Sequence, residues 1–305
     1  MDEQAFIEYL EVKKSIDDRS LNCAVWKTLV TAMPPATCEQ PWQILEIGAG
    51  IGTMVRRLME WDFLRYADYT ALDACATFLE EGRRRLSNWA RAMGLKALSE
   101  GQRLRISDRS RDIRINFVDA ELSRWLKEAA PQERYDLLIA HAFLDLVNLE
   151  ETLPGLMRCL KKDGLFYFTL NFDGLTLLEP PIEETLDEGI LSFYHRTMEE
   201  RRAGEKPSAG ALSGRRLLRA LERAGGTLLR AGASDWVVHS VEGQYPAGEE
   251  RFLQFFLQMV EEALRGHNAI DPSRLEAWFG ARRDQLQRGE LSLIVHQLDC
   301  VGRRR

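Results

Sequence analysis

The sequence is poor in residues that build disulfides and metal sites. Its 305 residues include five cysteines and five histidines, and no two cysteines form a Cys-x-x-Cys pair. No histidine lies at zinc-ligand spacing from any cysteine. We therefore expect free thiols in a reducing compartment and no metal, as in a cytosolic (cytoplasmic) protein.

The chain also lacks a long apolar run and a surplus of basic residues. No stretch approaches the roughly 18 apolar residues of a membrane helix, and the N-terminal segment has no signal-peptide core. The formal net charge is −6, whereas proteins that neutralise nucleic-acid phosphates normally present a basic surface. We therefore expect no membrane and no nucleic acid as a partner.

What is present is an alternation of strand-like and helix-like segments. The expected strands are 43–47, 69–73, 113–118, 135–141 and 164–171, and the helices between them are 52–62, 75–92, 121–128 and 150–161. This alternation predicts an α/β fold with a doubly wound, mostly parallel sheet. Its ligands should bind at the carboxyl ends of the strands.

Other segments interrupt this regular pattern. We expect helices within 1–40, a long excursion at 174–211, a helix at 212–224 and a strand at 227–238. Two amphipathic helices follow at about 247–265 and 272–288, and we expect His267 in the turn between them. A final strand comes after the second helix. We divide the chain into an N-terminal helical lid (1–40), a ligand-binding core (41–173), a lid or substrate insertion (174–211), and a C-terminal half of the core (212–305) with a two-helix insertion (about 247–288).

The stretch QILEIGAGIGTMVRRL, residues 43–58, is the most informative part of the sequence. Glycines at 48, 50 and 52 directly follow an apolar strand, where they permit a tight turn and close approach of a ligand. The spacing departs from the dinucleotide pattern Gly-x-Gly-x-x-Gly, whose third glycine is replaced by Thr53. Glu46 would repel a pyrophosphate but favour a ligand with an ammonium group. The stretch therefore argues against NAD.

Two more acids end the next strands of the expected sheet. Asp73 follows the glycines by about twenty residues, where a carboxylate can accept the hydroxyls of a ribose. Asp119 ends the third strand, where it could receive an exocyclic adenine amine or instead cap the next helix. Acids at successive strand ends indicate a nucleoside-containing ligand.

These motifs resemble those of the class I S-adenosylmethionine-dependent methyltransferases of small molecules. LEIGAGIG resembles the family's first motif, ALDA and FVDAE its second and third, and KKDGLFYFTL the approach to its fifth strand. The resemblance covers roughly residues 40–172 well and the remainder loosely. It implies a Rossmann-like, seven-stranded sheet of order 3-2-1-4-5-7-6, with helical insertions forming a lid. It also implies S-adenosylmethionine as cofactor and S-adenosylhomocysteine as product.

The resemblance further implies roles for individual residues in binding this cofactor. Glu46 would contact the ammonium, Asp73 the ribose, and Arg19 the methionine carboxylate unless it is an ordinary surface arginine. The other expected contacts are Gly48, Ala49, Gly50 and Gly52 in the turn, Ala74, Asp119 and Ala120 around the adenine, and His141 and Phe143 near the sulfonium.

The acceptor is less well specified by the sequence. The candidate substrate residues are Asp145, Asn171, Asp173, Tyr194 and His195. His141 or His195 could act as general base, since imidazole titrates near neutrality, but both could equally pack. Asn171 and Asp173 could instead serve the turn at Gly174. HAFLDL lacks the Asn/Asp-Pro-Pro-aromatic motif of nucleic-acid amino-methyltransferases, so a small-molecule acceptor fits best.

Several functional alternatives stay open at this point. The expected reaction is O-, N- or C-methylation, but an aminopropyltransferase on the same fold or a non-catalytic S-adenosylmethionine-binding partner subunit would also fit. The apolar stripe of helices 247–288 suits either a lid over the acceptor or a homodimer interface.

Overall fold

A ten-stranded sheet runs through the computed structural model, which describes residues 1–266 and 270–305. His267, expected in a turn, lies outside these residues. The strands of the sheet are β1 Trp42–Ile47, β2 Tyr66–Asp73, β3 Lys96–Glu100, β4 Arg103–Ser107, β5 Asp112–Asp119, β6 Tyr135–His141, β7 Leu160–Glu179, β10 Gly226–Ala233, β11 Trp236–Val238 and β12 Ser292–Arg304. A separate small hairpin pairs β8 Arg202–Ala203 with β9 Lys206–Pro207.

The strand order confirms the predicted fold class. The order is β10-β12-β7-β6-β1-β2-β5-β4-β3, and β11 pairs with β12. The five strands from β7 to β5 are parallel, while β12 runs antiparallel to β7. With β3, β4 and β11 set aside, this is the expected seven-stranded order with its last strand antiparallel. β3 and β4 widen the sheet, and β11 follows β10 along the same strand, β12.

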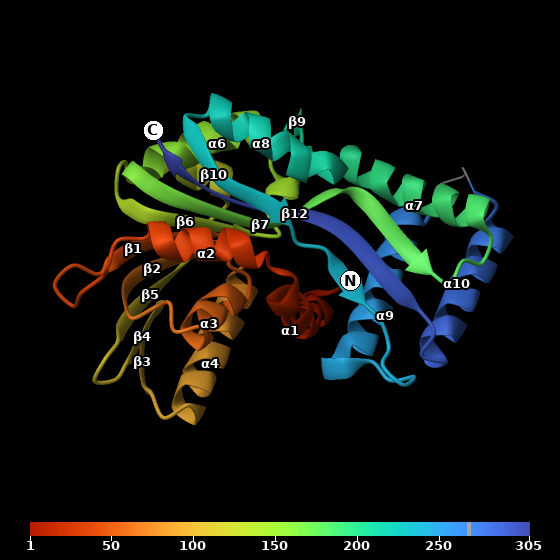
Figure 1. The fold of residues 1–305 in the computed structure, drawn as a ribbon, viewed down its shortest axis with the longest axis horizontal. Helices are drawn as coiled ribbons and strands as arrows, with labels where there is room; N and C mark the ends of the chain where they lie inside the picture. The colour runs from red at the N-terminus through yellow and green to blue at the C-terminus, as the bar shows by residue number, and fades with distance from the viewer. Residues whose placement is uncertain (267–269) are drawn as a thin grey trace.

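Helices cover both faces of the parallel part of the sheet (Figure 1). On one face lie α2 Cys23–Ala32, α3 Thr53–Glu60 and α4 Ala76–Ala92. On the other lie α5 Leu122–Glu128, α6 Leu149–Cys159 and α8 Ser213–Arg223. Each layer buries its own hydrophobic cluster against the sheet, as alternating strands and amphipathic helices require.

A second hydrophobic core lies beyond the regular sheet. β7 does not stop at Asn171, as expected, but continues to Glu179, which pairs with Ser292 of β12. Figure 1 shows this long ribbon with helices gathered around it. These helices are α1 Glu3–Ser20, α7 Glu184–Glu199, α9 Glu249–Leu264 and α10 Pro272–Gln287. The expected excursion therefore begins inside a continuous strand.

The apolar stripe of α9 and α10 is buried within the chain itself. Phe252, Phe255 and Phe256 of α9 are at most 4% exposed, and Trp278 and Phe279 of α10 are 1% exposed. These side chains belong to the core around the long ribbon. Packing within one chain therefore accounts for the stripe without a second copy. No helix among the described residues has both the length and the apolar character needed to cross a membrane.

Candidate functional site

A cavity of about 740 Å³ opens at the carboxyl ends of the parallel strands. Its floor includes Glu46 of β1, Asp73 at the end of β2, Ala120 after β5 and His141 of β6. Helices α1, α7 and α9, together with β11 and β12, supply the remaining walls. Doubly wound sheets bind their ligands at this edge.

The glycine turn after β1 forms one wall and depends on backbone conformations that favour glycine. Gly48 has φ +66° and Gly50 has φ +51°, both in the left-handed region. A Cβ atom on Gly48 would lie 2.2 Å from the ring of Phe143, and one on Gly50 would lie 3.3 Å from Leu10. The turn therefore fits closely against the loop after β6 and against α1.

Asp73 fixes this turn to the end of β2. One carboxylate oxygen accepts a hydrogen bond from the Gly50 amide at 2.8 Å, and the other accepts one from the Cys75 amide at 2.9 Å. Burial raises the pKa of Asp73 above its ordinary value. Because Asp73 also lines the cavity, its remaining lone pairs are available to a ligand.

Glu46 is a nearly enclosed carboxyl group at the floor of the cavity. It is 2% exposed, and the hydroxyl of Tyr69 donates a hydrogen bond to it at 2.7 Å. Burial raises the pKa of Glu46 to about 8. An ionised carboxylate is costly in such a place unless a cation pairs with it, so the site favours a positively charged ligand group.

Asp17 of α1 ties the N-terminal helix to the cavity. Its carboxylate accepts from Lys13 at 2.5 Å, from His141 at 3.0 Å and from the indole of Trp236 at 3.0 Å. Burial alone would raise the pKa of Asp17, but Lys13, His141 and Arg57 outweigh burial and hold it well below its ordinary range. An ionised Asp17 therefore joins α1, β6 and β11.

His141 is held by hydrogen bonds at both ring nitrogens. Nε2 faces Asp17, and Nδ1 faces the hydroxyl of Thr169 at 2.8 Å. Burial lowers the pKa of His141 to about 4. We assign the neutral tautomer in which Nε2 donates to Asp17 and Nδ1 accepts from Thr169, because Asp17 is ionised. Neither nitrogen is left free to act as a general base.

Aromatic side chains form another part of the cavity wall. They are Phe6, Tyr9, Phe172, Tyr194, Trp236 and Phe256, all members of the core around the long ribbon, and we call this part the aromatic chamber. The carboxylate of Asp145, just after β6, lines the same cavity and pairs with Arg201 at 3.5 Å.

Comparison with known proteins bears on this fold. No family model matches the sequence, and no curated protein matches it. A solved structure of a putative methyltransferase from Bacillus halodurans is 13% identical, with a TM-score of 0.51 over 92% of this chain and 99% of that one. The chain has the fold of the class I S-adenosylmethionine-dependent methyltransferases.

Two other solved structures are similar at lower scores. The YcgJ protein from Bacillus subtilis is 12% identical, with a TM-score of 0.49 over 93% of this chain and 99% of that one. A geranyl diphosphate C-methyltransferase from Streptomyces coelicolor is 11% identical, with a TM-score of 0.44 over 92% of this chain and 77% of that one.

Within this methyltransferase fold, many of the predicted site residues come together. Those that line the cavity are Glu46, Gly48, Ala49, Gly50, Asp73, Ala74, Ala120, His141, Phe143, Asp145 and Tyr194. Gly52 instead begins α3, with φ +75° and Leu86 against it. The glycines and strand-end acids converge because the parallel strands that carry them end at one edge.

Arg19 does not reach the cavity of this methyltransferase fold. It lies in the last turn of α1, where it pairs with Glu249 and donates to the Val237 carbonyl at 2.8 Å. The cation that α1 places in the cavity is Lys13, which points to a different side of the helix. Arg19, which was predicted to contact the methionine carboxylate, instead joins α1 to α9.

Four other predicted residues also lie outside the cavity. Asp119 is exposed at the end of β5, although its neighbours Ala120 and Glu121 line the cavity. Asn171 donates to the Leu298 carbonyl at 2.8 Å, and Asp173 pairs with Arg215 at 2.9 Å. His195 instead bonds Thr176 at 3.0 Å. Adjacent residues of a helix point about 100° apart, so Tyr194 faces the cavity while His195 does not.

Sequence reasoning missed Tyr9, Lys13, Asp17 and Trp236, which line the cavity. Lys13 and Asp17 are four residues apart in α1, and both are at most 5% exposed. A charged pair on the apolar side of the N-terminal helix was the one local signal for them. No sequence pattern indicated Trp236, because it reaches the cavity through a strand far along the chain.

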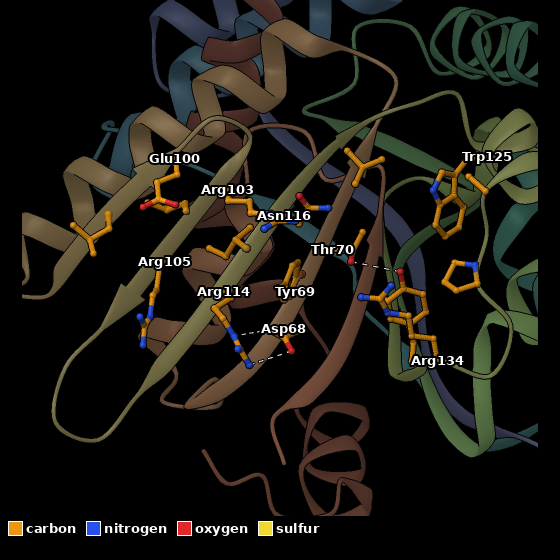
Figure 2. Close-up of a pocket in the computed structure, with 17 residues that line it drawn as sticks. Asp68, Tyr69, Thr70, Glu100, Arg103, Arg105, Arg114, Asn116, Trp125 and Arg134 are labelled. Atoms are coloured by element: carbon orange, nitrogen blue, oxygen red, sulfur yellow. Dashed lines mark hydrogen bonds and ion pairs between the residues drawn. The ribbon is translucent and has the colours of Figure 1, made fainter. Parts of the chain in front are cut away.

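A separate depression of about 600 Å³ lies on the face of β2 to β5 opposite α4 (Figure 2). It exists because the short helix α5 leaves this face of the sheet partly uncovered. Figure 2 shows Arg114 pointing toward Asp68, to which it is paired at 2.6 Å. None of the predicted site residues lines this depression. Within the described residues, no group of three or more His, Cys, Asp or Glu side chains could hold a metal ion.

Proposed function

We propose that the protein is an S-adenosylmethionine-dependent methyltransferase that acts on a small molecule. The observation that supports this most directly is the wall formed by Glu46, the glycine turn and Asp73. In this wall a buried carboxyl group lies near a backbone turn whose glycines leave no space for larger side chains. This wall faces an aromatic chamber in the same cavity.

The residues present fit a ligand with an ammonium group and a ribose. Glu46 would pair with the ammonium, which would lower the pKa that burial has raised. Asp73 would hold the ribose hydroxyls, and Lys13 would approach the methionine carboxylate. Ala74, Ala120 and Phe78 line the cavity where the adenine would lie. When bound, S-adenosylmethionine supplies a methyl group on a positively charged sulfur.

The protein's own contribution to methyl transfer is alignment and exclusion of water. We propose that residues 1–40, 174–211 and 247–288 act as lids over a core made of 41–173, 212–246 and 289–305. In support, α1, α7 and α9 supply side chains to the walls of the cavity. Alignment of two reactants can supply much of the acceleration, so a general base is optional. His141 positions α1 in this proposal, and Asp145, which is already paired with Arg201, would orient the acceptor rather than serve as a base.

The test is calorimetry with S-adenosylmethionine, S-adenosylhomocysteine and NAD. We expect the two sulfur compounds to bind and NAD not to bind. Transfer of a radiolabelled methyl group to a component of a small-molecule library would then establish the reaction. Binding of NAD without binding of S-adenosylhomocysteine would refute the proposal.

The geometry does not favour an aminopropyltransferase. Such an enzyme needs free acids for the amines of a polyamine. Here Asp17 is paired with Lys13 and Asp145 with Arg201. Degraded glycines would have favoured the non-catalytic partner subunit, and here the glycine turn is complete.

A further inference from the structure

The aromatic chamber is apolar but contains two hydroxyl groups that the protein leaves free. Tyr9 of α1 and Tyr194 of α7 are 7% and 6% exposed. Thr197 donates to the main-chain carbonyl of Tyr194, but within the described part of the chain neither tyrosine hydroxyl makes a hydrogen bond to another residue. The hydroxyl of Tyr167 has neither a hydrogen-bond partner nor contact with solvent. The hydroxyls of Tyr9 and Tyr194 differ from it in that both still face open space.

Asp145 lines the same cavity as Tyr9 and Tyr194. Burial raises the pKa of both tyrosines, that of Tyr194 to about 12; the carboxylates of Asp17 and Asp145 add to the rise at Tyr9, and that of Asp145 adds to it at Tyr194. This effect agrees with their shared place in the cavity, since charges act strongly only over short distances. We call Tyr9, Tyr194 and Asp145, which come from elements far apart in the sequence, the polar corner of the chamber.

The charges of the chamber compensate one another. Asp145 pairs with Arg201, and Asp17 pairs with Lys13 at 2.5 Å. Asp145 would repel an anionic ligand, and Lys13 and Arg201 would repel a cationic one. A diphosphate would need several free cations, which the aromatic walls do not provide. A ligand without net charge therefore fits best.

We propose that the methyl acceptor is a neutral, mainly apolar molecule whose hydroxyl group is held by Tyr9, Tyr194 and Asp145. This inference rests on the proposed function, because it assigns the acceptor to the same cavity. The aromatic walls would take the apolar body of the molecule, with rings packed against rings. The polar corner would orient the hydroxyl, since a buried hydroxyl needs hydrogen-bond partners.

A matched set of naphthalene probes tests this assignment. Equilibrium dialysis would measure binding of naphthalene, 2-naphthol, 2-naphthoate and 2-naphthylmethylammonium to the full chain, with and without saturating S-adenosylhomocysteine. We expect 2-naphthol to bind about tenfold more tightly than naphthalene. We expect both charged probes to bind more weakly than naphthalene. Equal or tighter binding of either charged probe would overturn the inference.

Variants that remove single hydroxyl groups locate the effect. The double variant Tyr9→Phe, Tyr194→Phe keeps both rings, which pack on Phe252 and Phe256. It should lose most of the preference for 2-naphthol and bind naphthalene as before. The matched control Tyr167→Phe removes a buried, unpartnered hydroxyl outside the cavity and should change neither affinity. A full preference for 2-naphthol in the double variant would contradict the inference.

The experiment separates this inference from the proposed function. If S-adenosylhomocysteine binds but the probes are not discriminated, the acceptor class is wrong and the methyltransferase proposal stands. If the probes are discriminated but S-adenosylhomocysteine does not bind, the chamber takes the stated ligand class and the methyltransferase proposal fails. If nothing binds, both are overturned.

Discussion

At the scale of single residues, Glu46 couples folding to pH. The pKa of its carboxyl is about 8 in the folded protein, against an ordinary value of 4.5. Between these values the folded state holds a proton that the unfolded state has lost. Its contribution is therefore fully present below pH 4.5 and is lost as the pH rises through 8. The cost of ionising this buried carboxyl group falls at the position where a cationic ligand would offset it.

We predict that Glu46→Gln flattens this pH dependence. The amide has no proton to lose, so the variant should gain stability relative to the wild type as the pH rises from 5 to 9, by a few kcal/mol. Urea unfolding at a series of pH values measures the difference. Parallel stability curves for the two proteins would show that Glu46 does not titrate in this range.

Asp73 is predicted to contribute directly to cofactor binding. Asp73→Ala should weaken binding of S-adenosylhomocysteine by about 1.5–3 kcal/mol, the range for hydrogen bonds to a charged group. Calorimetry measures the loss, and circular dichroism checks that the variant is folded. Asp119→Ala is the comparison: Asp119 is exposed and does not line the cavity, so its loss should leave affinity unchanged. Unchanged affinity in Asp73→Ala would remove Asp73 from the site.

At the scale of elements, the turn between β1 and α3 is the most constrained part of the site. We predict that Gly48→Ala abolishes S-adenosylhomocysteine binding, because the new Cβ would lie 2.2 Å from the ring of Phe143. Gly94→Ala is the control: Gly94 has φ +75° but nothing within 4 Å of a Cβ. Both variants should lose about 1–2 kcal/mol of stability from backbone strain, but the control should still bind. Calorimetry and thermal unfolding separate the two effects.

The elements differ in how far the sequence predicted them. Most strands of the parallel core and the helices between them were predicted to within about two residues, because their hydrophobic periodicity is local. The exceptions are β2, which begins at Tyr66 rather than Tyr69, and β7, which extends at both ends beyond the predicted 164–171. β3 and the helix α7 were not predicted. β3 has only five residues, with one of them buried, so it carries little pattern. The continuation of β7 beyond Asn171 depends on pairing with β12, more than a hundred residues away.

At the scale of the whole molecule, the cavity draws its walls from both ends of the chain. We predict that S-adenosylhomocysteine at 100 times its Kd raises the free energy of unfolding by about 2.7 kcal/mol. The midpoint of thermal unfolding should rise by roughly 5 °C. NAD at the same concentration should leave the midpoint unchanged. Differential scanning calorimetry makes the measurement, and an equal rise with NAD would contradict the choice of ligand.

The sequence by itself determined the sheet and the donor side of the cavity. Glu46, the glycine turn and Asp73 are recognisable because each lies within a few residues of a strand end. The topology of parallel strands then places all of them at one edge. The residue types near each strand end, together with this rule for parallel strands, were sufficient to predict the donor side.

Only the tertiary structure decided which residues of the surrounding helices face the cavity. Lys13, not Arg19, lines it from α1, and Tyr194, not its neighbour His195, lines it from α7. Both choices depend on the rotation of a helix about its axis, which is set by the surfaces packed against it. For α1 those surfaces are α3, α9 and β11, contributed by distant parts of the chain. A local pattern carries no record of such contacts, so these residues appeared only in the folded molecule.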